Sequence, residues 1–428
     1  MSNKLLYLEG LRGIAAFMVY QIHTLLDYNL SFRPAWMWYQ QWTICVPIFF
    51  VLSGRVLTVS PMRKGDQTSI IASMIKRPFR LTLPVIGVMI VGKIIYELGL
   101  FDLKSPCRIS EYAFCASSDK VAHTFFDMFV RPFLYINNSP GLFPNYNSAI
   151  PLPYTSWTLP LEYTNSNYLY VLTIVLIHFK ESLQIQYFII IVALLLSLFG
   201  HLWTAHFIVG LIFADLSNRG VFKKLMTYKL TYLCSTLAIL LSLFLSIDSP
   251  YSIGAIANAS VKNLQVNSQM IFGAWETYYG SDERPMVLLL CTAVMFAIET
   301  SSWLQWILGS KPFVFLGRIS YMLYLAHPIF NYSIHQLLYK AIDSTTPVGS
   351  ACLFVVTTSC ACLFSEILVR IIDEPVLKLL NYAYDKIFKM SPKKFNVVPS
   401  TSVVQQTREI DNQPMVIDIP AVQIEKDR

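Results

Sequence analysis

Two ionisable side chains, Arg12 and His23, lie in the first apolar stretch of the sequence. Burying such a group in hydrocarbon costs about 2.5 to 3.5 kcal/mol, so a membrane helix that keeps one usually has a use for it. A step of eleven residues turns an α-helix through about three full turns, so both side chains face the same side, roughly 16 Å apart. A histidine that titrates near neutrality can act as a general base, which makes His23 a candidate catalytic residue. Arg12 could instead anchor the interface, and His23 could be a packed structural residue.

A second set of charged residues follows later in the chain. Arg77 and Arg80 are three residues apart on a helical turn, so their guanidinium groups can face one ligand, and such planar forks suit phosphate groups. Cytoplasmic positive charge is the alternative explanation for both, and for Arg12. Glu162 could orient an imidazole, bind hydroxyl groups or cap the start of a helix. Arg55 could snorkel to the interface or add a phosphate contact.

Apolar segments of spanning length must position these residues. Of 428 residues, 54% are apolar and 14% are charged, and the mean hydropathy is +0.49. A water-soluble domain normally carries nearly twice that charge, and a spanning barrel would show short alternating segments. We therefore expect an all-α polytopic membrane protein, a bundle of about ten transmembrane helices, with a count between about nine and eleven. The predicted spans are 11–28, 42–60, 81–98, 166–179, 187–201, 203–217, 230–247, 286–308, 319–340 and 349–372.

The spans predict a membrane domain, residues 1–390, followed by a polar tail, 391–428, whose composition is typical of a disordered segment. The dense Lys and Arg clusters all fall on the cytoplasmic side if both termini are cytoplasmic, so the net charge of +7 predicts no nucleic-acid partner. The longest connection, about 99–164, then faces the other side. Its Cys107 and Cys115 could form a disulfide or stay free. The membrane could be an endomembrane or the plasma membrane.

Five segments in order along the chain resemble the acyltransferase-3 family of membrane acyltransferases. That family begins with an arginine or lysine, ten residues and a histidine, which Arg12 and His23 match, and continues with an RxxR motif, which Arg77 and Arg80 match. Arg55 and Pro160 depart from the family pattern. The segments are Leu8–Ala16 with His23, Val46–Gly54, Arg77–Arg80, Ser156–Glu162 and Leu316–Pro328.

The resemblance implies transfer of an acyl group, typically acetyl, from acyl-coenzyme A to a hydroxyl of a carbohydrate, a lipid or a secondary metabolite. It implies a stand-alone membrane domain with the lipid bilayer, acyl-coenzyme A and a hydroxylated acceptor as partners. Separately, the sequence has no CxxC or HExxH motif, so we expect no metal, and no GxGxxG motif, so a nucleotide-binding fold has no support. A transporter or exporter of an acylated or related small molecule is the alternative. The implied residues are His23 and Glu162 for catalysis, Arg12, Arg77 and Arg80 for the donor, and Trp157, Tyr321 and His327 for the substrate.

Overall fold

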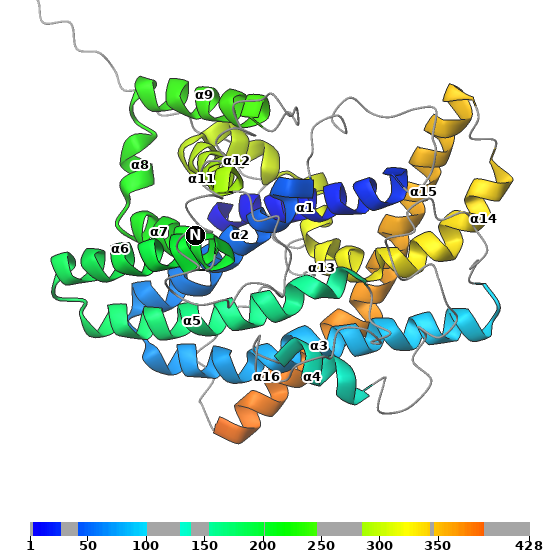
Figure 1. The fold of residues 1–428 in the computed structure, drawn as a ribbon, viewed down its shortest axis with the longest axis horizontal. Coiled ribbons are helices and arrows are strands. Elements are labelled where there is room, and N and C mark those ends of the chain that lie inside the picture. Colours follow the sequence, from blue (N-terminus) through cyan, green and yellow to red (C-terminus); the bar gives the residue numbers. More distant parts are fainter. Residues whose placement is uncertain are drawn as a thin grey trace, which may run out of the picture. The chain divides into compact units, whose positions relative to one another are not determined.

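A computed structural model describes residues 3–26, 42–100, 129–137, 154–200, 202–245, 285–342 and 346–388. Within these ranges the chain forms helices and short turns and no strand (Figure 1). Met1–Leu380 form one compact unit and Asn381–Arg428 a second, and the contacts considered below lie within the first. The helices are α1 (Asn3–Leu26), α2 (Trp42–Lys64), α3 (Gln67–Glu97), α4 (Arg131–Asn137), η4 (Tyr154–Trp157), α5 (Thr158–His178), α6 (Leu183–Gly200), α7 (Leu202–Asn218), α8 (Val221–Leu225), α9 (Lys229–Leu245), α11 (Pro285–Thr300), α12 (Ser302–Leu308), α13 (Lys311–Tyr332), α14 (Ile334–Ala341), α15 (Pro347–Leu368), η5 (Val369–Asp373) and α16 (Glu374–Phe388).

Four helices in the described ranges are long and apolar enough to cross a membrane, and a bent pair raises the number to five. They are Ile44–Lys64 of α2, all of α3, all of α13, and the continuous stretch Pro347–Tyr384 that begins with α15. The bent pair is α11 with α12, and the shorter apolar helices are Leu183–Leu198 and Leu202–Asn218. The fold is thus that of an all-helical membrane protein, and the expected number of about ten spans stays a prediction.

Several helices differ from the predicted spans in where they begin or break. The predicted span 286–308 bends by 97° between α11 and α12, and the predicted span 319–340 breaks at Ser333, whose backbone is not helical. Helix α3 begins at Gln67 rather than 81, because the Asp66 side chain accepts hydrogen bonds from the amides of Thr68 and Ser69 and so caps the helix. Helix α5 begins at Thr158 rather than 166, which places Glu162 inside a helix.

Helices α1 and α13 pack closely and run in the same direction. Gly13 lies against Gly317, where a Cβ atom on Gly13 would lie 2.4 Å from the Gly317 nitrogen. Ten residues further along both helices, the rings of His23 and His327 are stacked. Small residues let two backbones approach in this way, so the glycines fix the two helices against each other.

Helices α2 and α7 form a second close, parallel pair. Phe50 packs edge-on against Trp203 with 5.2 Å between ring centroids, and further along Asn218 donates a hydrogen bond of 2.9 Å to the carbonyl oxygen of Val59. Between them, Gly54 meets the backbone of α7, where a Cβ would lie 2.1 Å from a carbonyl oxygen of Phe207.

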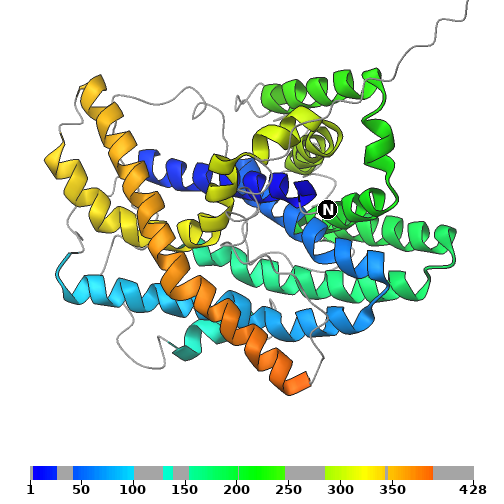
Figure 2. The ribbon, with the colours of Figure 1, turned by 180° about the vertical axis from the view of Figure 1, so that it is seen from behind.

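Helix α3 runs parallel to α13 and is crossed by the end of α15. Tyr321 donates a hydrogen bond of 3.0 Å to the carbonyl oxygen of Leu81, and Ile329 lies against Gly92 further along. In Figure 2 the orange helix α15 passes in front of α3, and η5 at its end brings Asp373 to Arg80. Helices distant in sequence thus meet around one interior space.

Candidate functional site

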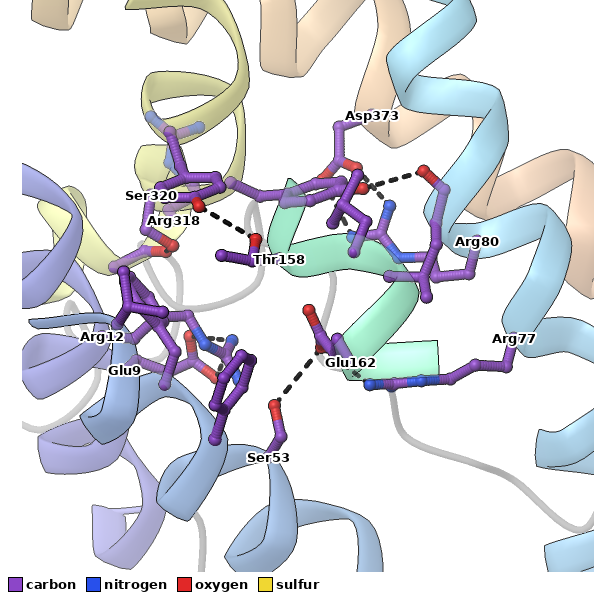
Figure 3. A pocket seen from close by; sticks show the side chains of 18 residues that line it. Glu9, Arg12, Ser53, Arg77, Arg80, Thr158, Glu162, Arg318, Ser320 and Asp373 are labelled. Carbon is purple, nitrogen blue, oxygen red and sulfur yellow. Dashed lines mark hydrogen bonds and ion pairs between the residues drawn. The ribbon is translucent and has the colours of Figure 1, made fainter. Parts of the chain in front are cut away.

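A polar cavity of about 340 Å³ opens among α1, α2, α3, α5, α13 and η5. In Figure 3 side chains from all six elements converge on it. Four arginines and three acidic residues are among the residues that line it, so a ligand in the cavity meets both guanidinium and carboxylate groups. These charged residues are Glu9, Arg12, Arg77, Arg80, Glu162, Arg318 and Asp373.

Glu162 joins three helices in the cavity. Arg77 Nη2 of α3 lies 2.7 Å from Glu162 Oε1 of α5, and Ser53 Oγ of α2 donates to the same oxygen at 3.3 Å. The Arg77 side chain is 13% exposed and that of Glu162 is 24% exposed, so a ligand in the cavity can reach this pair.

Arg80 is held on two sides by groups from other helices. Its guanidinium forms a bidentate ion pair with the carboxylate of Asp373 and lies over the ring of Tyr321, 5.3 Å from the ring centroid. Asp373 ends η5, a π-helical turn, and such turns often occur at functional sites because they redirect side chains.

The other two arginines of the cavity are also paired. Arg12 Nη1 lies 3.1 Å from the carboxylate of Glu9, one turn earlier on α1, and Arg318 pairs with Glu366 of α15. All four guanidinium groups therefore already hold carboxylates, and a phosphate or other anion could exchange for them, because guanidinium binds both through the same forked geometry.

A histidine pair lies further along α1 and α13. The rings of His23 and His327 are stacked, with centroids 5.2 Å apart and planes at 21°. His327 Nδ1 lies 3.1 Å from the carbonyl oxygen of Leu323, which favours the tautomer with the proton on Nδ1 and a basic Nε2. Neither histidine is among the described residues that line the cavity, although the Tyr324 ring, which does line it, lies 6.3 Å from the ring of His327.

The residues predicted from sequence therefore occupy three places. Arg12, Arg77, Arg80, Glu162 and Tyr321 line the cavity together. His23 and His327 form the histidine pair. Trp157 lies in η4, directly before the cavity residue Thr158, with its ring 6.1 Å from that of Trp203.

Sequence reasoning missed Arg318 and Asp373 as members of the site. Arg318 lies within the motif Leu316–Pro328, but it belongs to the basic clusters that cytoplasmic topology accounts for, and Asp373 follows the last predicted span. The available signal for Asp373 was an acidic residue directly after the apolar span 349–372. Burying a carboxylate is costly, so such a residue is usually kept for a purpose. No group of three or more His, Cys, Asp or Glu side chains among the described residues could hold a metal ion.

Arg55 neither snorkels nor lines the cavity. Its side chain is 3% exposed and its Nε lies 2.9 Å from Oε1 of Glu299, which is equally buried. Tyr7 donates a hydrogen bond of 2.8 Å to the other oxygen of Glu299. The departure from the family pattern at this position thus belongs to a buried ion pair that ties α1 and α2 to α11.

The helices and the cavity define a membrane protein with a charged interior cavity. The family model described as an acyltransferase domain matches residues 5–366. The chain belongs to the acyltransferase-3 family, as its motifs predicted, and this membership supports a membrane acyltransferase and does not favour the transporter alternative. Comparison with curated proteins gave no match, and comparison with solved structures gave none either.

Proposed function

We propose that the protein transfers an acyl group, typically acetyl, from acyl-coenzyme A to a hydroxyl group of a carbohydrate, a lipid or a secondary metabolite. The observation that carries this proposal is the convergence of four arginines on one cavity of a family acyltransferase. Coenzyme A has phosphates at one end and its thioester at the other. A cluster of guanidinium groups is the chemistry expected to hold the phosphate end.

Arg77 and Arg80, with Arg12, are the proposed donor ligands, and Arg318 joins them on the same cavity. The donor's phosphates would replace the carboxylate partners of these arginines. Because one anion exchanges for another, no guanidinium group is left without a partner in either state. Each such charge-assisted hydrogen bond contributes about 1.5 to 3 kcal/mol.

His23 is the proposed general base, with His327 stacked against it. The base takes the proton of the acceptor hydroxyl as its oxygen attacks the thioester carbon. The new carbon–oxygen bond forms, the carbon–sulfur bond breaks, and the leaving thiolate takes up a proton to give free coenzyme A.

Glu162 is proposed to act on the acceptor. Its carboxylate lies in the cavity with Ser53 and Arg77, where it can accept hydrogen bonds from acceptor hydroxyl groups and orient them. Tyr321, on the cavity wall, and Trp157, directly before the cavity residue Thr158 in the chain, are the proposed aromatic surfaces for a sugar or apolar acceptor, as aromatic rings commonly are in ligand sites.

We also propose that both termini are cytoplasmic. The Lys and Arg clusters of the sequence support this side, and the directions of the helices support the alternation of the predicted spans. Helices α1, α3 and α13 run parallel, as the first, third and ninth predicted spans must if each predicted span crosses the bilayer. Helices α2 and α7 correspond to the second and sixth predicted spans and also run parallel to each other.

The test of this function is thioester turnover by the purified full-length protein in lipid nanodiscs, with acetyl-coenzyme A and hydroxylated acceptors of each class. Wild-type protein should release free thiol only as acceptor is acylated. His23→Ala should still bind the donor, while transfer falls by about two to four orders of magnitude because the base is missing.

His178→Ala is the matched control, because His178 is exposed at the end of α5, away from the cavity. It should transfer at the wild-type rate. If His23→Ala folds and transfers at that rate too, the base is another residue, and His327→Ala is the next variant to measure. Absence of thioester turnover with every acceptor in wild-type protein would contradict the proposed donor.

A further inference from the structure

The ring of Tyr324 lies between the arginine cavity and the histidine pair. It lines the cavity, and its centroid is 6.3 Å from that of His327, at 66° between the planes. Along α13 it comes two turns after Arg318 and one turn before His327. With a rise of 1.5 Å per residue, Arg318 and His327 are separated by roughly 13 Å along the helix axis.

The Tyr324 ring is fixed by three neighbouring elements. Its hydroxyl donates a hydrogen bond of 3.0 Å to the carbonyl oxygen of Thr155 in η4 and lies 2.9 Å from Oγ1 of Thr158 at the start of α5. Phe49 of α2 packs edge-on against the ring, with 5.9 Å between centroids. The side chain is 8% exposed, so these contacts hold it in a largely enclosed place.

A donor that keeps its phosphates at the arginines must bring its acyl group to the histidine pair. Because the Tyr324 ring lies 6.3 Å from the ring of His327, an acyl group whose thioester carbon reaches the histidine pair lies beside the Tyr324 ring. A two-carbon acyl group adds little volume there. A longer chain has to displace the ring, which breaks the hydrogen bonds to Thr155 and Thr158 in surroundings where replacements from water are scarce.

We propose that Tyr324, held by Thr158, selects the length of the acyl chain and restricts the enzyme to short acyl groups. The proposal rests on the proposed function, since it takes acyl-coenzyme A as donor and the histidine pair as the place of reaction. It assigns a specificity-determining role to a residue that the sequence motifs leave without one.

The test compares kcat/KM for acetyl-, butanoyl- and octanoyl-coenzyme A in full-length protein in lipid nanodiscs. Wild-type protein should prefer acetyl. Tyr324→Ala should raise the octanoyl-to-acetyl ratio by about tenfold or more, since a few methylene groups in a tight pocket are discriminated by at least that factor. Tyr324→Phe keeps the ring but loses its anchoring hydroxyl, so it should raise the same ratio by a smaller factor.

Affinity for coenzyme A without an acyl group should stay at the wild-type value in both variants, because the arginines are intact. Phe213→Ala is the control for loss of a buried ring, since Phe213 packs on Phe222 and does not line the cavity. It should leave the order of preference among the three donors unchanged.

An unchanged octanoyl-to-acetyl ratio in a folded Tyr324→Ala protein would overturn the proposal while leaving acyl transfer itself standing. If Tyr324→Ala does not fold, the octanoyl-to-acetyl ratio of kcat/KM is measured in Tyr324→Phe and Thr158→Val instead. Wild-type ratios in both of these variants would also overturn the proposal. Failure of the proposed function is distinct, because wild-type protein would then turn over none of the three donors.

Discussion

Two ion pairs between helices, Arg55–Glu299 and Arg77–Glu162, use the same chemical groups in different surroundings. Both partners of the first are 3% exposed, and Tyr7 occupies the second oxygen of Glu299. The partners of the second are 13% and 24% exposed and line a cavity with Ser53. The first pair is closed to ligands and the second is open to them.

Exposure to the cavity decides which of these charged residues are available for binding. A buried pair loses its hydration on both sides, so each partner depends on the other, and removing one leaves an uncompensated charge. A pair on a cavity keeps access to water or ligand, so its carboxylate can be exchanged for another anion. A charged residue inside an apolar helix therefore indicates only that its burial costs free energy. It indicates a binding site when its side chain is also exposed to a cavity.

The largest expected effect comes from breaking the closed pair. Glu299→Ala should lower the free energy of unfolding by about 3 to 5 kcal/mol, because the Arg55 guanidinium would remain buried without its partner. Thermal and denaturant unfolding of the purified protein measures this. If the free energy of unfolding falls by less than about 1 kcal/mol, water can reach Arg55 in the variant. The contrast between the two ion pairs would then disappear.

A smaller effect on stability is expected at the open pair. Glu162→Ala should lower the free energy of unfolding by only about 1 to 2 kcal/mol, since water in the cavity can solvate Arg77. Acyl transfer should nevertheless fall strongly. The same unfolding assay measures the stability, and thioester turnover measures the acyl transfer. A stability loss as large as that of Glu299→Ala would instead place Glu162 among the structural residues.

The smallest effect is expected at Asp66, a charged residue outside the apolar spans. Hydrogen bonds from Thr68, first its hydroxyl and then its amide with that of Ser69, lower the pKa of Asp66 below its ordinary value. The stabilisation is present at neutral pH and is lost as the pH falls below about 4, through the folded-state pKa.

Asp66→Ala should therefore cost about 0.5 to 1 kcal/mol at neutral pH by removing the cap of α3, and almost nothing in acid. Unfolding measured at both pH values tests the sign. An equal loss at both would mean that the carboxylate charge does not contribute.

The sequence predicted the class of fold and much of the cavity because both depend on local patterns. Apolar runs predict helices, and the family motifs carry Arg12, Arg77, Arg80, Glu162 and Tyr321, which the structure brings together. The motifs could not show that His23 stacks on His327, because that contact depends on how α1 and α13 pack through their glycines.

Other features depended on long-range partners that no local pattern encodes. For Arg55 the sequence left two alternatives, snorkelling and a phosphate contact, and indicated neither Glu299 nor a buried ion pair, because Glu299 lies 244 residues away in sequence. Asp373 was not assigned to the site because a π-helical turn, rather than a regular helix, directs it toward Arg80. Helix breaks at Ser301 and Ser333 were missed because the apolar pattern continues through them.

We propose that the arginines of the open cavity hold the phosphates of the donor. Calorimetry tests this most directly by measuring the affinity of the protein for two ligands. One is coenzyme A and the other is pantetheine, which lacks the phosphates. Arg77→Ala or Arg80→Ala should weaken coenzyme A binding by about ten- to a hundred-fold and leave pantetheine binding unchanged. Arg63→Ala, which removes an exposed arginine at the end of α2, should change neither affinity. Wild-type affinity for coenzyme A in both cavity variants, or an equal loss for both ligands, would contradict the account.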